Sequence, residues 1–160
     1  MNKVFTLIIS LLFLSGCVST QTKDIFLKEK ITDKKELAMS GSRAPWIYEI
    51  ERRLRKNGFK IKRMASQNSS IERVSSTKTD IYNEASSRYI LRIDGYASNT
   101  SMTRCFGGGY NFNYINAELI DIRKNETVLH FSDSGYSEGC PPLSGTIFGD
   151  ISQIVTEAWK

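Results

Sequence analysis

The apolar run at the start of the chain constrains the fold most, because it removes the first residues from the folding problem. Lys3 precedes this run, which extends from Val4 to Leu14 and is interrupted only by two hydroxyl residues. About eleven such positions suit the hydrophobic segment of a signal peptide, whereas a membrane-spanning helix needs roughly 20 apolar residues. We therefore expect residues 1–16 to be a signal peptide and the fold to be built from the rest.

Small residues and a cysteine end this segment, in the order Leu14-Ser15-Gly16-Cys17. This order and position resemble the lipobox of bacterial lipoproteins, and the resemblance covers about the first 17 residues. In that family the cysteine thiol is diacylated, the residues before it are removed and the new amino group is acylated, with chains such as palmitate. The resemblance implies that Cys17 is a lipidated first residue, held stably in a membrane. The alternative is an ordinary signal peptide with an incidental cysteine.

The residues after Cys17 bear on which membrane holds the protein. Val18 and Ser19 occupy the positions where the family's inner-membrane retention rule favours Asp. The resemblance therefore implies an outer-membrane lipoprotein whose domain faces the periplasm. We interpret residues 17–24 as a polar, lipidated tether and residues 25–160 as a single domain, a length that allows a modest core.

The cysteines predict a disulfide. If Cys17 carries lipid, Cys105 and Cys140 remain as a pair in an oxidising compartment, where a disulfide is the default. It would close a loop of about 36 residues and stabilise the fold by about 3–4 kcal/mol. Two free thiols or a metal pair are the alternatives. Since zinc wants four ligands and His130 is the only histidine, we expect no metal and no cofactor.

Hydrophobic periodicity predicts an α+β fold. A helix over Pro45–Asn57, with Gly58 placed to end it, and a second helix from Ile147 each carry one apolar stripe. Asp33–Glu36 has the spacing of a helix capping box. Alternating residues predict strands at 25–31, 59–62, 88–97, 110–122 and 127–134, with Asn125 as the left-handed residue of a hairpin turn. The expected architecture is a two-layer domain with a mostly antiparallel sheet of four to five strands and both amphipathic helices on one face.

The order of these elements resembles the small periplasmic α/β domains of envelope lipoproteins and of the TolB amino-terminal type. The resemblance is carried by the helix that ends at Gly58-Phe59, by Ala117–Asp121, and by Val128–Phe131 after the turn. Those families serve envelope assembly and partner binding rather than catalysis. The resemblance implies such a role here by analogy of fold, without a diagnostic motif.

The most unusual internal stretch is Cys105-Phe106-Gly107-Gly108-Gly109-Tyr110. Three consecutive glycines allow a sharp turn or a close approach to a ligand, and the residues of a phosphate-binding loop do not surround them. One interpretation is a flexible turn stapled by Cys105, and the other is a recognition loop that presents Phe106 and Tyr110. The disulfide to Cys140 would then hold two loops together at one edge of the domain.

Two further patterns are candidate binding surfaces. Tyr110, Phe112 and Tyr114 alternate along a strand, which indicates either core packing or an aromatic platform for a sugar or nucleobase. From residue 43 to 63 there are eight basic residues and two acidic ones, which indicates a solvated helix face or a site for an anionic partner. The basic residues of interest on the predicted helix are Arg52, Arg53, Arg55 and Lys56.

Catalytic signals are weak, since no nucleophile elbow, zinc-protease motif or Cys-His signature is present. Acid–base candidates without a sequence-level pairing are Asp94, Asp121, Asp133 and Glu138. We expect a non-enzymatic lipoprotein whose domain binds a protein partner in envelope assembly, maintenance or transport, with no nucleic-acid partner. The alternative function is a binding module for an anionic envelope polymer or glycan. The sequence does not indicate an oligomeric state.

Overall fold

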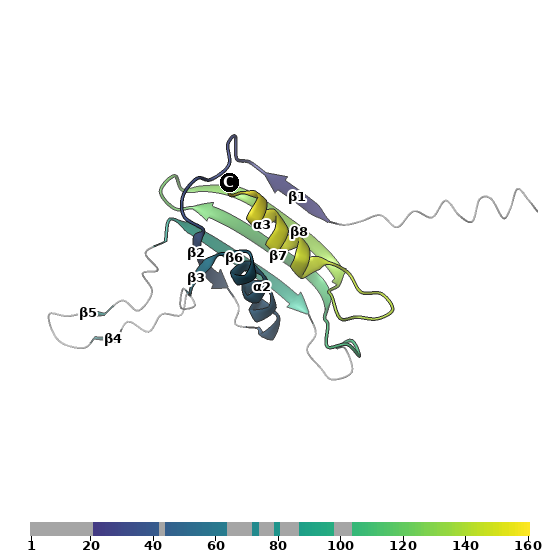
Figure 1. The fold of residues 1–160 in the computed structure, drawn as a ribbon. Coiled ribbons are helices and arrows are strands. Elements are labelled where there is room, and N and C mark those ends of the chain that lie inside the picture. Colours follow the sequence, from purple (N-terminus) through teal and green to yellow (C-terminus); the bar gives the residue numbers. More distant parts are fainter. Residues whose placement is uncertain (1–20, 42–43, 64–71, 74–78, 81–86, 98–103) are drawn as a thin grey trace, which may run out of the picture.

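Figure 1 shows the computed structural model, which describes residues 21–41, 44–63, 72–73, 79–80, 87–97 and 104–160. In this part of the chain one six-stranded sheet has the strand order β1-β8-β7-β6-β2-β3, and two helices cover it. The elements are β1 (Thr22–Ile25), β2 (Glu36–Gly41), α2 (Pro45–Lys56), β3 (Lys60–Arg63), β4 (Glu72–Arg73), β5 (Thr79–Asp80), β6 (Tyr89–Ala97), β7 (Asn111–Asp121), β8 (Glu126–Tyr136) and α3 (Ile147–Glu157). The α+β class with two helices is therefore confirmed.

The centre of the sheet is the antiparallel set β6-β7-β8, which the alternation of apolar residues predicted. Leu91, Ile93 and Leu119 are fully buried beneath the helices. Asn125 takes a positive φ of 54° in the turn between β7 and β8, as predicted. An asparagine tolerates this left-handed conformation because its short polar side chain bonds locally.

The sheet has more strands than expected, and it is mixed. β2 lies between β6 and β3 and runs parallel to both, so six strands replace the expected four to five. The capping-box spacing of Asp33–Glu36 leads into this strand, not into a helix. Leu37, Ala38 and Met39 are all buried, because a strand inside a sheet presents a continuous apolar run without alternation. α2 supplies the crossover that parallel strands such as β2 and β3 need.

The first strand lies earlier than expected. β1 occupies Thr22–Ile25 and pairs with β8 at the edge of the sheet, whereas the sequence predicted a strand at 25–31. Ile31 forms an isolated bridge with Trp159 near the C-terminus. Most of the polar stretch over residues 67–84 lies outside the described residues. Its described pieces, β4 and β5, pair with each other.

The two helices lie side by side on one face of the sheet, as expected (Figure 1). α2 presents the buried residues Trp46, Ile50 and Leu54, and α3 presents Ile151 and Val155. These stripes follow the helical period of 3.6 residues, so each helix buries one face against the sheet. The result is a single layer of helix over a single layer of sheet.

The strand pair β7–β8 gives the domain two distinguishable ends. At the hairpin end, a turn over residues 122–125 joins the two strands directly. At the loop end, the loop over residues 104–110 leads into β7, and the loop over residues 137–146 leads from β8 into α3. Both helices begin at the loop end, so that end gathers two loops and two helix N-termini (Figure 1).

Candidate functional site

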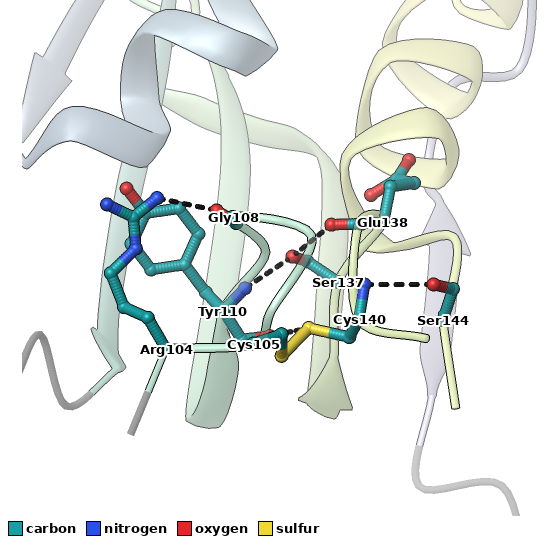
Figure 2. Close-up of a disulfide and its surroundings, with 8 residues drawn as sticks. All are labelled: Arg104, Cys105, Gly108, Tyr110, Ser137, Glu138, Cys140 and Ser144. Carbon is teal, nitrogen blue, oxygen red and sulfur yellow. Dashed lines mark hydrogen bonds between the residues drawn. A yellow bond between two sulfur atoms is a disulfide. The ribbon is translucent and has the colours of Figure 1, made fainter. Parts of the chain in front are cut away.

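The disulfide predicted between Cys105 and Cys140 is present, with 4.8 Å between the two Cα atoms. It joins the two loops of the loop end, as the sequence led us to expect. Cys140 is buried, and its backbone N–H donates to Ser144 Oγ at 2.9 Å (Figure 2). The bridge therefore ties β7 to the segment that leads into α3.

Backbone hydrogen bonds also connect the two loops. Gly109 N donates to the Gly139 carbonyl at 2.9 Å, and Ser137 N donates to the Tyr110 carbonyl at 2.8 Å. Tyr110 N in turn donates to Ser137 Oγ at 2.9 Å, and this hydroxyl donates to the Glu138 carbonyl (Figure 2). These bonds extend the β7–β8 ladder past its last strand pair and hold the loops as one unit.

The glycines are explained by this close packing. A Cβ atom on Gly107 would lie 2.5 Å from the Gly139 carbonyl oxygen, and one on Gly109 would lie 2.6 Å from Cys140 Sγ. Real Cβ atoms do not approach other atoms so closely, so only glycine fits at either position. At Gly108 an added Cβ would make only an ordinary contact, 3.7 Å from the Arg104 guanidinium, but this residue takes a φ of +81°. The glycines therefore allow the loop to pack closely against residues 138–140.

Two charged side chains brace this unit. The Arg104 guanidinium lies 4.6 Å from the centre of the Tyr110 ring and donates to the Gly108 carbonyl, so it covers one side of the glycine loop (Figure 2). On the other side, the Glu138 carboxylate accepts hydrogen bonds from Phe148 N and Gly149 N, at 3.1 and 2.7 Å. A carboxylate there satisfies free N–H groups at the N-terminus of α3.

A pocket of about 420 Å³ lies between the start of α2 and the glycine loop. Its wall combines the backbone of the three glycines with aromatic side chains and a few charged groups. Its lining includes Trp46, Tyr48, Glu49, Arg52, Glu138 and the glycines 107–109. We call it the loop-end pocket. It brings the two candidate surfaces of the sequence, the glycine loop and the basic helix, into one site at Arg52.

The basic residues of α2 are largely paired with acidic neighbours. Glu49 accepts two hydrogen bonds from Arg52, at 2.6 and 3.0 Å, and one from Arg53 at 3.0 Å. The Arg52 hydrogen bond is the main reason that the pKa of Glu49 lies below its usual value. Arg53 also lies 3.3 Å from Glu138, and Arg55 bonds to Glu51 at 2.8 Å. The surface is therefore one of mixed charge.

Lys56 is exposed at the end of α2. The pocket is lined by residues at the start of this helix, such as Pro45 and Arg52. Of the four basic residues proposed from the sequence, only Arg52 lines the loop-end pocket. The other three, Arg53, Arg55 and Lys56, lie outside this pocket.

The aromatic residues separate into two groups. Tyr110 and Phe112 are buried against Phe148, so core packing is the correct interpretation for them. Tyr114 is 42% exposed, because the ladder to β8 shifts register between Phe112 and Ile115 and a bulge turns its side chain outward. Phe106 is fully exposed at the tip of the glycine loop and does not line the pocket.

The carboxylates suggested as acid–base candidates lie apart in the structure. Asp121 is buried under Arg88 at 2.6 Å, Asp133 accepts from Gln21, and Glu138 binds the helix N-terminus. Asp94 lies on β6, where its charge raises the pKa of Tyr114. His130 is half-buried on β8. Within the described ranges, no group of three or more His, Cys, Asp or Glu side chains is placed to hold a metal ion.

Cys17 and the rest of residues 1–20 lie outside the described residues, so the predicted lipidation is not tested. Neither described helix is both long enough and apolar enough to cross a membrane.

The sequence did not single out Tyr48, and it suggested Glu138 only as an acid–base candidate. Tyr48 is 52% exposed and follows the buried pair Trp46 and Ile47 on α2. An aromatic residue outside the apolar stripe was the available signal. Glu138 gave no such signal, because its role depends on the approach of α3 to a loop ten residues earlier in the chain.

No protein-family model matches this chain, and no curated protein matches it. Among solved structures, the chain is similar to PelC from Paraburkholderia phytofirmans, which was solved as a dodecamer. The identity is 16%, over 88% of this chain and 98% of that chain, with a TM-score of 0.48. A point variant of the same PelC dodecamer gives 13% identity, 88% and 99% coverage and the same TM-score.

The chain is also similar to TolB from Acinetobacter baumannii, with 12% identity and a TM-score of 0.41. That match covers 87% of this chain and 31% of TolB. These are weak structural similarities of fold, and they assign no function to the chain.

Proposed function

We propose that this chain is a lipoprotein anchored in the outer membrane by acyl chains on Cys17, with a non-catalytic periplasmic domain that binds a protein partner in envelope assembly, maintenance or transport. The membrane part of the proposal rests on the order Leu14-Ser15-Gly16-Cys17. The binding part rests on one observation, the loop-end pocket. The partner contributes a short segment with one or two side chains that enter this pocket.

The composition of the pocket favours a protein segment. Tyr48, Trp46 and Arg52 belong to the residue types that are enriched at protein interfaces and that contribute most to binding. The disulfide and the packed glycines hold one wall in place before binding, so little conformational entropy is lost when a partner orders on it. Backbone groups of a glycine wall also allow close approach by another chain.

The alternative partner, an anionic polymer, is less well supported. Such a partner needs positive charge that is available to its own anionic groups. Arg52 shares the pocket wall with Glu49 and Glu138, and Glu49 binds two of the helix arginines. The charge that the sequence places on α2 is thus mostly compensated within the domain.

Site-specific photocrosslinking tests the binding proposal. A photoreactive amino acid replaces Tyr48 in the full-length protein in its native membrane, and the matched control replaces Tyr96, which is similarly exposed at 58%. We expect one defined protein to crosslink from position 48 and not from position 96. Arg52→Ala in the same protein should reduce the yield.

Equal crosslinking from both positions would contradict the pocket as the binding site. Crosslinking of polysaccharide or lipopolysaccharide without protein from position 48 would replace this proposal by the alternative. The membrane proposal is tested separately by Cys17→Ser, which should move the protein from the membrane fraction to the soluble fraction.

A further inference from the structure

The described chain begins at the loop end of the domain. Gln21 Nε2 donates to Asp133 Oδ2 at 2.9 Å and to Asp150 Oδ2 at 3.0 Å, and Lys23 Nζ binds Asp150 at 2.9 Å. Asp150 belongs to the first turn of α3, which starts from the loop over residues 137–146. In Figure 1 the start of β1 and this loop lie at the same end of the sheet. The hydrogen bonds therefore fix the position from which residue 21 leaves the domain.

The register of β1 determines the direction of departure. Thr22 pairs with Ser132 and Ile25 pairs with Leu129, so β1 runs from the loop end toward the hairpin end. β8 continues past Ser132 to Tyr136 before its loop begins, which is about 13 Å at ~3.3 Å per residue. The end of β8, from which the loop over residues 137–146 begins, thus lies beyond Thr22 at the end of the sheet where the described chain starts.

The distance from Cys17 to Gln21 is short. Four residues span at most about 14 Å even when fully extended. An acyl-bearing Cys17 at the membrane surface therefore keeps Gln21 within that distance of the lipid headgroups. β8 continues for a similar distance past its pairing with Thr22 before its loop begins, so the loop end lies within reach of the same membrane surface.

The loop tips carry apolar side chains that nothing in the described domain covers. Phe106 is fully exposed on one loop, and Leu143 is 63% exposed on the other. The disulfide fixes these loops relative to each other, and Arg104 lies one residue before the bridge. Aromatic and leucine side chains beside a basic residue suit the boundary between headgroups and acyl chains.

An exposed aromatic residue is not by itself evidence for membrane contact, and the domain supplies a comparison. Phe26 is 60% exposed, and its backbone N–H donates to the Val128 carbonyl near the hairpin end. Phe26 lies four residues beyond Thr22 along the chain. At ~3.3 Å per strand residue this places it about 13 Å farther from the loop end than the start of β1. The position of the tether, rather than exposure, distinguishes Phe106 from Phe26.

We infer that the loop end faces the bilayer that holds Cys17, and that Phe106 and Leu143 insert into its interfacial region. This inference rests on the proposed lipid anchor. It adds an orientation, with the loops against the membrane and the hairpin end directed away from it. The loop tips contact the bilayer, whereas the loop-end pocket beside them remains accessible to the proposed protein partner.

Depth-dependent fluorescence tests the orientation. Phe106→Trp and the control Phe26→Trp are made in the lipidated full-length protein, in vesicles of phosphatidylethanolamine and phosphatidylglycerol with brominated acyl chains. The native Trp46 and Trp159 are buried and give the same background in both variants. We expect a blue-shifted emission and at least about twofold more bromine quenching at position 106 than at position 26, since interfacial side chains lie ~5–10 Å deep. Leu143→Trp should behave like Phe106→Trp.

Equal quenching at positions 106 and 26 in protein that floats with the vesicles would overturn the orientation but leave the lipid anchor intact. A protein that does not float would overturn the anchor itself. Emission at position 106 that is insensitive to the vesicles, yet shifts on addition of solubilised envelope proteins, would assign Phe106 to a protein partner and also overturn the inference.

Discussion

The two ends of the β7–β8 pair hold their connecting segments in different ways. At the hairpin end a short turn with one left-handed residue, Asn125, joins the strands. At the loop end two loops that are distant in sequence are held together by a disulfide, by backbone hydrogen bonds and by glycines that leave no space for a Cβ atom. The hairpin end needs only local turn chemistry, whereas the loop end needs a fixed arrangement of non-local parts.

This difference is the reason for placing the proposed binding surface at the loop end. Strand connection alone does not require Gly107 or Gly109, because a turn needs glycine only where φ is positive. The loop end instead holds two loops against each other through a disulfide and hydrogen bonds, while Phe106 remains fully exposed and a pocket forms beside it. Rigid presentation of exposed groups is what a binding surface requires.

The largest expected effect concerns the disulfide. Replacing both Cys105 and Cys140 by Ser should lower the free energy of unfolding by about 3–4 kcal/mol, because the unfolded chain regains the freedom of a long loop. Denaturant unfolding measures this loss. Hydrogen exchange in the same variant should accelerate at the loop end and stay nearly unchanged at the hairpin end. A uniform acceleration over both ends would contradict the claim that the disulfide stabilises the loop end specifically.

The glycine loop should give the next largest effect. Gly109→Ala should cost about 2–3 kcal/mol, because the added methyl group overlaps Cys140 and forces the two loops apart. Gly108→Ala is the matched control in the same loop, where an added Cβ would make only an ordinary 3.7 Å contact with Arg104 and the positive φ opposes the change, at about 1 kcal/mol. Thermal unfolding of both variants measures whether Gly109→Ala loses more stability than Gly108→Ala. Equal losses would show that backbone conformation, and not packing against the second loop, explains the glycines.

The ion pair near the hairpin end should have an intermediate and pH-dependent effect. Hydrogen bonds from Arg88 hold the pKa of buried Asp121 below its usual value. A lowered pKa in the folded state adds stability that is complete above the unfolded value of about 3.9 and is lost as pH falls through the folded value. Asp121→Asn should therefore cost about 1–2 kcal/mol at pH 7, and this cost should shrink as pH falls below about 3.9.

Unfolding curves of the wild type and Asp121→Asn between pH 2 and 7 provide the measurement. The difference between the two curves reports the loss of the Asp121 carboxylate together with its hydrogen bonds to Arg88. A difference that stays constant over this range would show that Asn fails to fit for steric reasons.

The hairpin turn should give the smallest effect. Asn125→Ala should cost about 1 kcal/mol, because alanine lacks the polar side chain that makes a positive φ tolerable. Asn125→Gly should be nearly neutral by the same reasoning. Chemical denaturation distinguishes the two. A loss with Ala as large as that of the disulfide variant would show that the hairpin end is not a simple local connection.

Much of the fold follows from local sequence patterns. The apolar stripes of α2 and α3, the alternation of β6, β7 and β8, and the turn at Asn125 each lie within a few consecutive residues. The pairing of Cys105 with Cys140 followed from the assignment of Cys17 to lipid, and the structure contains that bridge. Such features need no knowledge of what lies across the sheet.

The parts that the sequence did not reveal depend on non-local contacts. β2 is a short apolar run, and its place between β6 and β3 comes from parallel pairing with distant strands. The bulge that turns Tyr114 outward is visible only in the register with β8. The loop-end pocket forms because the start of α2 lies beside a loop that follows the helix by about 50 residues. Neither the basic residues of the helix nor the glycines of the loop predicted the pocket alone.

Both proposals depend on the anchor at Cys17, and the intact mass of protein extracted from its native membrane tests it most directly. The predicted mass is that of a chain that begins at Cys17, carries acyl groups, and has two fewer hydrogens for the Cys105–Cys140 bridge. A chain that retains residues 1–16, or that begins elsewhere with an unmodified Cys17, would contradict the lipoprotein assignment and leave only the fold.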